Sequence, residues 1–350
     1  MSDSLYLRPL GLLYGAAATA AVEGGHAGWL AGGPVAFSAL EVIEGEAGDA
    51  TRSFSPFAKL AASPEPEITE TLDWIVSPRP DIAGLSLDTT RIMGVVNVTP
   101  DSFSDGGLYD TSEAAIAHGA RLAKDGADIL DIGGESTRPG SDPVEAAHEV
   151  ERIVPVIEGL VGVKAKISAD TRKAVVMEKA ASAGAHILND VSALTHDPRS
   201  LAVAAKSGLS VILMHAQGDP KTMQDDPTYA DVLLDVYDYL EGRIAACEAE
   251  GVSRDRLIVD PGIGFGKTLE HNLALLDGLA LFHGLGVPLL LGASRKRFIG
   301  TLAGEPDASK RVPGSIAGAL AGVARGVQIV RVHDVAETRQ ALVIWNAVNG

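Results

Sequence analysis

The residues best suited to chemistry in this 350-residue chain stand at the ends of eight short apolar runs. They are Asn97, Asp131, Glu135, Asp170, Asn189, His215, Asp260, the trio Ser294, Arg295 and Lys296, then Arg331 and His333. Short, rigid side chains such as Asp170, Asn189 and Asp260 suit the donors and acceptors of a planar ring. Lys296, Arg331 and His333 can offer positive charge to an anion, and the Asn97 oxygen suits a magnesium ion. The sequence shows neither a zinc-type ligand cluster nor a Ser–His–Asp arrangement, so the set predicts a site for a planar heterocycle and a phosphate.

The segment "DPGIGFGKT", Asp260–Thr268, looks at first like a phosphate-binding loop. A Walker-A loop needs a glycine five positions before Gly266, where this chain has Pro261. Because proline has no backbone N–H, a phosphate would lose a donor there. We therefore expect Asp260 to be the functional residue, with Pro261 and the glycines turning the chain close to a flat ligand. Lys267, the Walker-like lysine, is expected to lie on the surface or in the loop.

The eight apolar runs lie between about residue 90 and the end of the chain, mostly with helix-length amphipathic segments between them. They are "RIMGVVNVTPD", "ADILDIGGEST", "KAKISADTR", "AHILNDVSA", "LSVILMHAQ", "RLIVDPGIGF", "VPLLLGASRK" and "VQIVRVHDV". Nearly continuous apolar runs are typical of parallel strands buried on both faces. Eight strand–helix units predict an α/β fold, a (β/α)8 TIM barrel whose strand ends meet at one mouth. An open doubly wound sheet is the alternative, but "NVTPDSF" after the first run lacks its glycine fingerprint.

Residues 1–86 differ from the barrel region, residues 87–350. They contain "SPEPE" and "SPRP", carry no chemical constellation, and include a strand-like run, "PVAFSALEVI", and a helix-like one, "EITETLDWIV". We expect an N-terminal accessory extension, whose role the sequence does not reveal. The run "LGLLYGAAATAA" could be read as a signal-peptide core, but Gly and Ala dilute its hydrophobicity and its flank carries only Arg8 against Asp3.

Composition narrows the class of partner. A net charge of −17 argues against nucleic-acid binding, which needs a basic surface, and against binding to acidic membranes. The only cysteine, Cys247, rules out an intrachain disulfide framework and a cysteine-rich zinc site. The sequence has no apolar stretch of about twenty residues, so we expect no transmembrane helix. These features indicate a cytoplasmic protein with small-molecule substrates.

Six motifs closely resemble those of the dihydropteroate synthases. They are "MGVVNVTPDSFSDGG", "DIGGESTRPGS", "LNDVSA", "DPGIGFGK", "GASRKRFIG" and "RVHDV", in order from about Arg91. The resemblance implies condensation of 6-hydroxymethyl-7,8-dihydropterin pyrophosphate with 4-aminobenzoate, which gives 7,8-dihydropteroate and pyrophosphate in folate biosynthesis. It also implies an SN1-like mechanism, a Mg²⁺ cofactor and a homodimer.

The resemblance further assigns residues to three pockets. The pterin would contact Asp170, Asn189, Met214, Asp260, Phe265 and Lys296, and the pyrophosphate would lie near Asn97, Asp131, Arg331 and His333, with Asn97 as the metal ligand. Phe103, Thr137 and Arg138, on two loops rich in Gly, Ser and Asp, would complete the aminobenzoate pocket. The catalytic residues would be Asp105, Arg138 and Lys296. Arg297 stands where several members have a serine near the aminobenzoate carboxylate, so its contact stays open.

Two alternatives to the synthase remain. Methyltetrahydrofolate-dependent methyltransferases share a pterin-binding barrel, but they need neither "TPDSFSDGG" and "STRPG" nor the anion site around "SRK" and "RVHD". A catalytically silent paralogue could bind the pterin without turnover, since resemblance of fold does not by itself establish activity.

Overall fold

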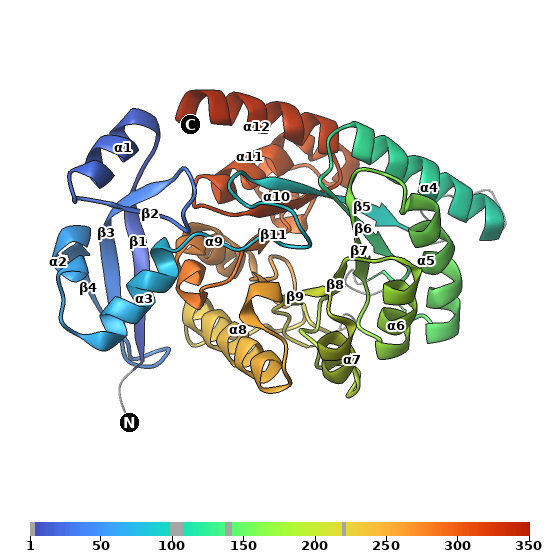
Figure 1. Cartoon of the computed structure of the whole chain (residues 1–350), viewed down its shortest axis with the longest axis horizontal. Helices are drawn as coiled ribbons and strands as arrows, with labels where there is room; N and C mark the ends of the chain where they lie inside the picture. Colours follow the sequence, from blue (N-terminus) through green and yellow to red (C-terminus); the bar gives the residue numbers. More distant parts are fainter. Residues whose placement is uncertain (1–3, 99–107, 137–141, 219–221) are drawn as a thin grey trace.

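The central feature is an eight-stranded parallel sheet closed into a barrel (Figure 1). The computed structural model describes residues 4–98, 108–136, 142–218 and 222–350, with only the backbone of 108–111. The strands are β5 (Arg91–Asn97), β6 (Ile129–Gly133), β7 (Lys166–Asp170), β8 (Ile187–Asp190), β9 (Ser210–Met214), β10 (Leu257–Asp260), β11 (Leu290–Leu291) and β12 (Ile329–Val332). They pair in the order β10-β9-β8-β7-β6-β5-β12-β11, and a bridge from Val259 to Leu289 joins the two end strands. Each predicted apolar run contains one strand, so the barrel prediction is confirmed.

Helices connect the strands and surround the barrel, as the crossover rule for parallel strands requires. They are α4 (Leu108–Lys124), α5 (Ala146–Leu160), α6 (Ala174–Ala183), α7 (Ser200–Ser207), α8 (Val232–Ala249), α9 (Leu269–Asp277), α10 (Arg297–Ala303), α11 (Val312–Val323) and α12 (Val335–Asn349), with 3-10 turns η2 (Arg254–Arg256), η3 (Leu279–Leu285) and η4 (Ala308–Lys310). Within the ranges that the structure describes, no helix is both long enough and apolar enough to cross a membrane.

The barrel interior changes from apolar to polar along the strands. Its lower layer is one buried cluster, formed by Met93, Ile129, Ile187, Ile212, Ile258, Leu290 and Ile329, with Ile82 and Leu87 from the segment before β5. Side chains two residues apart on a strand share a face. Two positions after Ile129, Ile187, Ile258 and Ile329 come Asp131, Asn189, Asp260 and Arg331. The strand period therefore places an apolar layer directly beneath a polar mouth.

The N-terminal residues form a separate antiparallel sheet beside the barrel (Figure 1). Its strands are β1 (Leu5–Leu13), β2 (Gly28–Trp29), β3 (Ala36–Glu44) and β4 (Thr51–Pro56), with helices α1 (Gly15–Glu23), α2 (Phe57–Ala61) and α3 (Pro66–Val76). The predicted strand and helix correspond to β3 and α3. The run that could be read as a signal-peptide core forms the end of β1 and the start of α1. Phe37, Leu40 and Ile75 lie in a hydrophobic core of this sheet.

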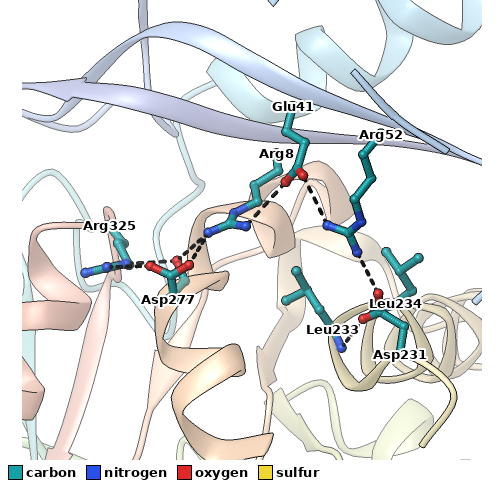
Figure 2. A network of polar contacts seen from close by, with 8 residues as sticks. All are labelled: Arg8, Glu41, Arg52, Asp231, Leu233, Leu234, Asp277 and Arg325. Carbon is teal, nitrogen blue, oxygen red and sulfur yellow. Dashed lines mark hydrogen bonds and ion pairs between the residues drawn. The ribbon is translucent and has the colours of Figure 1, made fainter. Parts of the chain in front are cut away.

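Ion pairs join the N-terminal sheet to the outer helices of the barrel (Figure 2). Glu41 of β3 is 6% exposed and accepts from two arginines of the sheet, Arg8 at 3.3 Å and Arg52 at 3.2 Å. Arg8 also donates to Asp277 at the end of α9, and Arg52 also donates to Asp231 just before α8. These two ion pairs add to hydrogen bonds that Tyr6 donates to Asp238 of α8 and Tyr14 donates to the Ala324 carbonyl oxygen after α11.

Candidate active site

The candidate site lies at the carboxyl ends of the barrel strands, where Arg331 of β12 links two acidic side chains. Its Nε donates to Asp131 Oδ2 at 2.6 Å, and its Nη2 donates to Asp170 Oδ2 at 2.8 Å. Asn189 Nδ2 donates to the same Asp131 oxygen at 3.1 Å. These four strand ends therefore form one hydrogen-bonded floor. Arg331, expected beside the pyrophosphate, also contacts Asp170, which was expected in the pterin pocket.

The carboxylates of this floor are buried and electrostatically coupled. Asp131 is fully buried, and no described residue donates a hydrogen bond to its Oδ1. Burial raises the pKa of Asp170, and the neighbouring Asp131 raises it further, against the opposing effect of Arg331. The pKa of Arg331 is raised by its two carboxylate partners despite burial. Arg331 therefore stays charged and compensates the floor.

A second part of the site is formed by Asp260, Lys296 and the loop after β10. Asp260 is 5% exposed, and its Oδ1 accepts from Gly262 N at 2.7 Å. Lys296 Nζ donates to the carbonyl of Ile263 and lies 4.4 Å from the centre of the Phe265 ring. Burial lowers the pKa of Lys296 to about 8, although Asp260 opposes this change. An amine, a carboxylate and an aromatic face thus meet at one wall.

This wall includes Met214 of β9, which pairs in register with Asp260 and is 4% exposed. The chain turns sharply after Asp260, because Gly262 has a φ of 70° and a Cβ there would lie 1.8 Å from the His215 carbonyl oxygen. Only glycine allows so close an approach. The expected sharp turn after Asp260 is therefore present.

Lys267 lies in the loop between β10 and α9, as one of the two expectations had it, but it is buried there, so the expectation of a surface position was wrong. The residue is 3% exposed, and its Nζ contacts His215 Nδ1 at 2.8 Å and the Phe265 carbonyl oxygen at 3.0 Å. Burial lowers the pKa of Lys267 to about 7 and that of His215 to about 3, the latter with a contribution from Lys267. A neutral His215 therefore accepts the hydrogen bond at Nδ1. Sequence reasoning missed this pair because the two residues are 52 positions apart.

The third group of predicted residues lies at the ends of β5, β11 and β12. His333 Nδ1 and the hydroxyl of Ser294 are 3.0 Å apart, and Ser294 Oγ also accepts from the His333 backbone N–H. Asn97 is half-buried at the end of β5, which pairs with β12. Arg295 instead forms an ion pair with Asp334, through Nε and Oδ2 at 3.0 Å. Of the two basic residues in the trio, Lys296 is thus the one assigned to the site, while Ser294 contacts His333.

Glu135, another strand-end residue, forms ion pairs with residues outside the proposed pockets. Its carboxylate accepts from Arg172, with Nη2 and Oε1 2.9 Å apart, and from Lys173, which also contacts the buried Glu149. Arg297 begins α10 and is exposed, so its contact stays open. The predicted aminobenzoate and catalytic residues Phe103, Asp105, Thr137 and Arg138 lie outside the described residues.

Comparisons with known proteins identify the family of this chain. Residues 93–333 match the family model of pterin binding enzymes. The dihydropteroate synthase of Neisseria meningitidis serogroup B is 52% identical over 269 residues, which are 75% of this chain and 94% of that protein. Dihydropteroate synthase from Xanthomonas albilineans, solved with 4-aminobenzoic acid, has a TM-score of 0.73 at 50% identity, covering 77% of this chain and 98% of that one. The same enzyme in complex with 7,8-dihydropteroate has a TM-score of 0.71 at 48% identity, with the same coverage.

The matched range begins inside β5, so the whole N-terminal sheet lies outside it. The barrel, its polar mouth and these relatives lead to one assignment. The chain belongs to the pterin-binding enzymes and, within them, to the dihydropteroate synthases.

Proposed function

We propose that the mouth of the barrel condenses 6-hydroxymethyl-7,8-dihydropterin pyrophosphate with 4-aminobenzoate. The observation that carries this proposal is that two groups of side chains lie next to each other. One is a wall that can hydrogen-bond a planar ring, and the other is a cationic floor that can hold an anion. The first contains Asp260 and Lys296 and the second Arg331, and a Cβ on Gly292 would lie within 4.0 Å of all three. A pterin ring and its pyrophosphate would fit this arrangement side by side.

In this proposal the pterin lies against Asp170, Asn189, Asp260 and Lys296, with Met214 and Phe265 as apolar neighbours. Carboxylates accept from the N–H groups of the ring, and the lysine amine donates to its acceptors. The small Gly292 leaves room above Asp260, Lys296 and Arg331. A flat ligand could therefore approach all three side chains.

The pyrophosphate lies near Asn97, Arg331 and His333, above Asp131. Among the described residues no three His, Cys, Asp or Glu side chains are grouped as a metal site. Mg²⁺ needs no such cage, because substrate phosphates and water commonly complete its coordination. The Asn97 amide oxygen fits this limited role, and Mg²⁺ bound there would offset the negative charge of the pyrophosphate. The aminobenzoate is assigned to Phe103, Thr137 and Arg138, with Asp105 also taking part in catalysis.

The reaction balances as an SN1-like substitution. The bond between the pterin methylene carbon and the pyrophosphate oxygen breaks, and its electron pair leaves with pyrophosphate. Arg331 and His333 stabilise that developing charge. The methylene cation is conjugated with the pterin ring, and the amine nitrogen of aminobenzoate forms the new C–N bond and then loses a proton. An aromatic amine attacks in its neutral form, so no strong general base is needed.

The test is release of pyrophosphate on mixing the protein with both substrates and Mg²⁺. We expect pyrophosphate release that depends on aminobenzoate. Release that does not depend on aminobenzoate would contradict the proposed reaction. Calorimetry with the pterin pyrophosphate separates the silent paralogue, which would bind this substrate but show no turnover. Omitting Mg²⁺ tests the cofactor assignment.

A homodimer in the cytoplasm also belongs to this proposal. On α12 the side chains of Val343, Ile344 and Val348 are 58%, 62% and 74% exposed. Exposed apolar side chains gathered on one helix are typical of association surfaces. Light scattering should give a mass twice that of one chain. The Ile344→Lys variant should give a mass closer to that of a single chain. The single cysteine, Cys247, which is buried, is consistent with a reducing compartment.

A further inference from the structure

The two ion pairs that join the N-terminal sheet to the outer helices lie at opposite ends of the barrel. Asp231 precedes α8, which follows β9, so it lies on the side of the carboxyl strand ends, where the site is. Asp277 ends α9 and lies on the opposite side. Arg52 therefore holds the sheet near the carboxyl ends of the barrel strands, and Arg8 holds it near their amino ends.

The upper attachment fixes the start of α8. Asp231 is the N-cap residue, and its Oδ1 accepts from the backbone N–H groups of Leu233 and Leu234 at 3.0 and 3.4 Å. Its other oxygen accepts from Arg52 Nη2 at 2.6 Å. The buried Glu41 holds Arg52 from the far side. The turn between β3 and β4 adds a packing contact, since a Cβ on Gly48 would lie 3.5 Å from Ala230.

Two residues in the segment that precedes Asp231 contact the wall assigned to the pterin. Tyr229 donates its hydroxyl to the Gly266 carbonyl oxygen at 2.7 Å. Gln224 Nε2 donates to the Gly264 carbonyl oxygen at 2.8 Å. These two carbonyls flank Phe265, whose ring lies below the Lys296 amine. A short chain of direct contacts thus runs from the N-terminal sheet to the pterin wall.

We infer that the N-terminal sheet braces the pterin wall, with Arg52 as a positioning residue that acts through Asp231 and Tyr229. Holding Asp231 fixes the segment that carries Tyr229, and Tyr229 fixes the loop that carries Phe265. The sheet thus contributes to pterin affinity without touching the ligand. This inference rests on the proposed pterin pocket.

The test compares full-length variants by calorimetry with the pterin pyrophosphate. Arg52→Met removes the upper ion pair, and Asp231→Asn removes its charge while keeping an oxygen for the cap. Each should raise the Kd for the pterin pyrophosphate about threefold, within the range of a partly exposed ion pair. The double variant should bind no more weakly than either single one, because both changes remove one bond. Arg52→Lys should recover part of the loss.

Asp277→Asn is the matched control, since it removes the charge of the ion pair at the opposite end of the barrel and leaves both Arg8 and Arg52 on Glu41. It should lower Tm to a similar degree and leave the Kd for the pterin pyrophosphate unchanged. The KM for aminobenzoate should stay the same in all variants. If Arg52→Met lowers Tm but leaves that Kd unchanged, the sheet only stabilises the fold and the inference is wrong. A wild-type protein that does not bind the pterin pyrophosphate would instead overturn the proposed pocket.

Discussion

Lys267 donates through Nζ to His215 Nδ1 at 2.8 Å, and this bond joins the loops that follow two adjacent barrel strands, β9 and β10. A second bond from the same amine to the Phe265 carbonyl oxygen extends the link to the proposed pterin wall. The amine is buried, which disfavours its charged form and lowers its pKa to about 7. Its protonation is therefore coupled to folding.

This coupling predicts how Lys267→Met changes the pH dependence of stability. Between pH 7 and about 10.4, Lys267 is protonated in the unfolded chain but mostly neutral in the folded one. Folding then releases a proton from Lys267. The free energy of unfolding of the wild type therefore contains a contribution that rises with pH in this window. Lys267→Met removes this contribution to the pH dependence. Urea unfolding at pH 7, 8.5 and 10 should show wild type gaining stability relative to the variant as pH rises.

Burial lowers the pKa of Lys296 to about 8, and this effect of burial is common to both proteins and cancels in the difference. The pKa of His215, about 3, lies below the window. A stability difference that is constant from pH 7 to 10 would show that Lys267 is solvated in the folded protein.

Asp260→Ala or Lys296→Ala should weaken pterin binding by more than ~2 kcal/mol, because each would leave a polar group of the bound ring without its partner. Calorimetry with the pterin pyrophosphate measures this loss. Lys310→Ala is the control, since Lys310 is 69% exposed and pairs only at 3.8 Å with Asp307. Near-wild-type affinity in either site variant would contradict the assigned pocket.

Arg331→Met should cost about 3–5 kcal/mol of unfolding free energy at pH 7, because it leaves the buried Asp131 without its cation and the buried Asp170 without its hydrogen-bond donor. Urea denaturation gives the value. The comparison is Arg339→Met, which breaks a more exposed pair with Asp128 and should cost about 1 kcal/mol or less. Equal losses in the two variants would mean that the floor is solvated.

Arg138→Ala should raise the KM for aminobenzoate several-fold and leave pterin affinity largely intact, because Arg138 is assigned to the second substrate alone. Steady-state kinetics with each substrate varied in turn tests this separation. Lys124→Ala, on the outer helix α4, provides a cationic control. An unchanged KM would remove Arg138 from the aminobenzoate pocket.

The sequence predicted the barrel well because its strands are buried on both faces and leave continuous apolar runs. The same period brought Asp131, Asn189, Asp260 and Arg331 to one end, since each follows an apolar residue by two positions. Local pattern was enough for these features.

Contacts between distant segments could not be predicted in this way. Lys267 has the local sequence of a loop lysine, and its burial depends on how the loops after β9 and β10 pack. The bonds from Arg331 to both Asp131 and Asp170 depend on the curvature of the closed barrel. The link from Arg52 to Asp231 spans 179 positions of sequence. Such partners are decided by tertiary packing rather than by local period.

The short connection between α3 and the barrel limits how far the N-terminal sheet can move. Between Val76, which ends α3, and the fully buried Ile82, residues 77–81 span at most about 18 Å when extended. Arg79 within them is itself buried and donates to the carbonyls of Trp74, Ser77 and His283. A connection this short, held at Arg79, restricts hinge motion between the sheet and the barrel. The sheet should therefore move with the barrel as one rigid body throughout turnover.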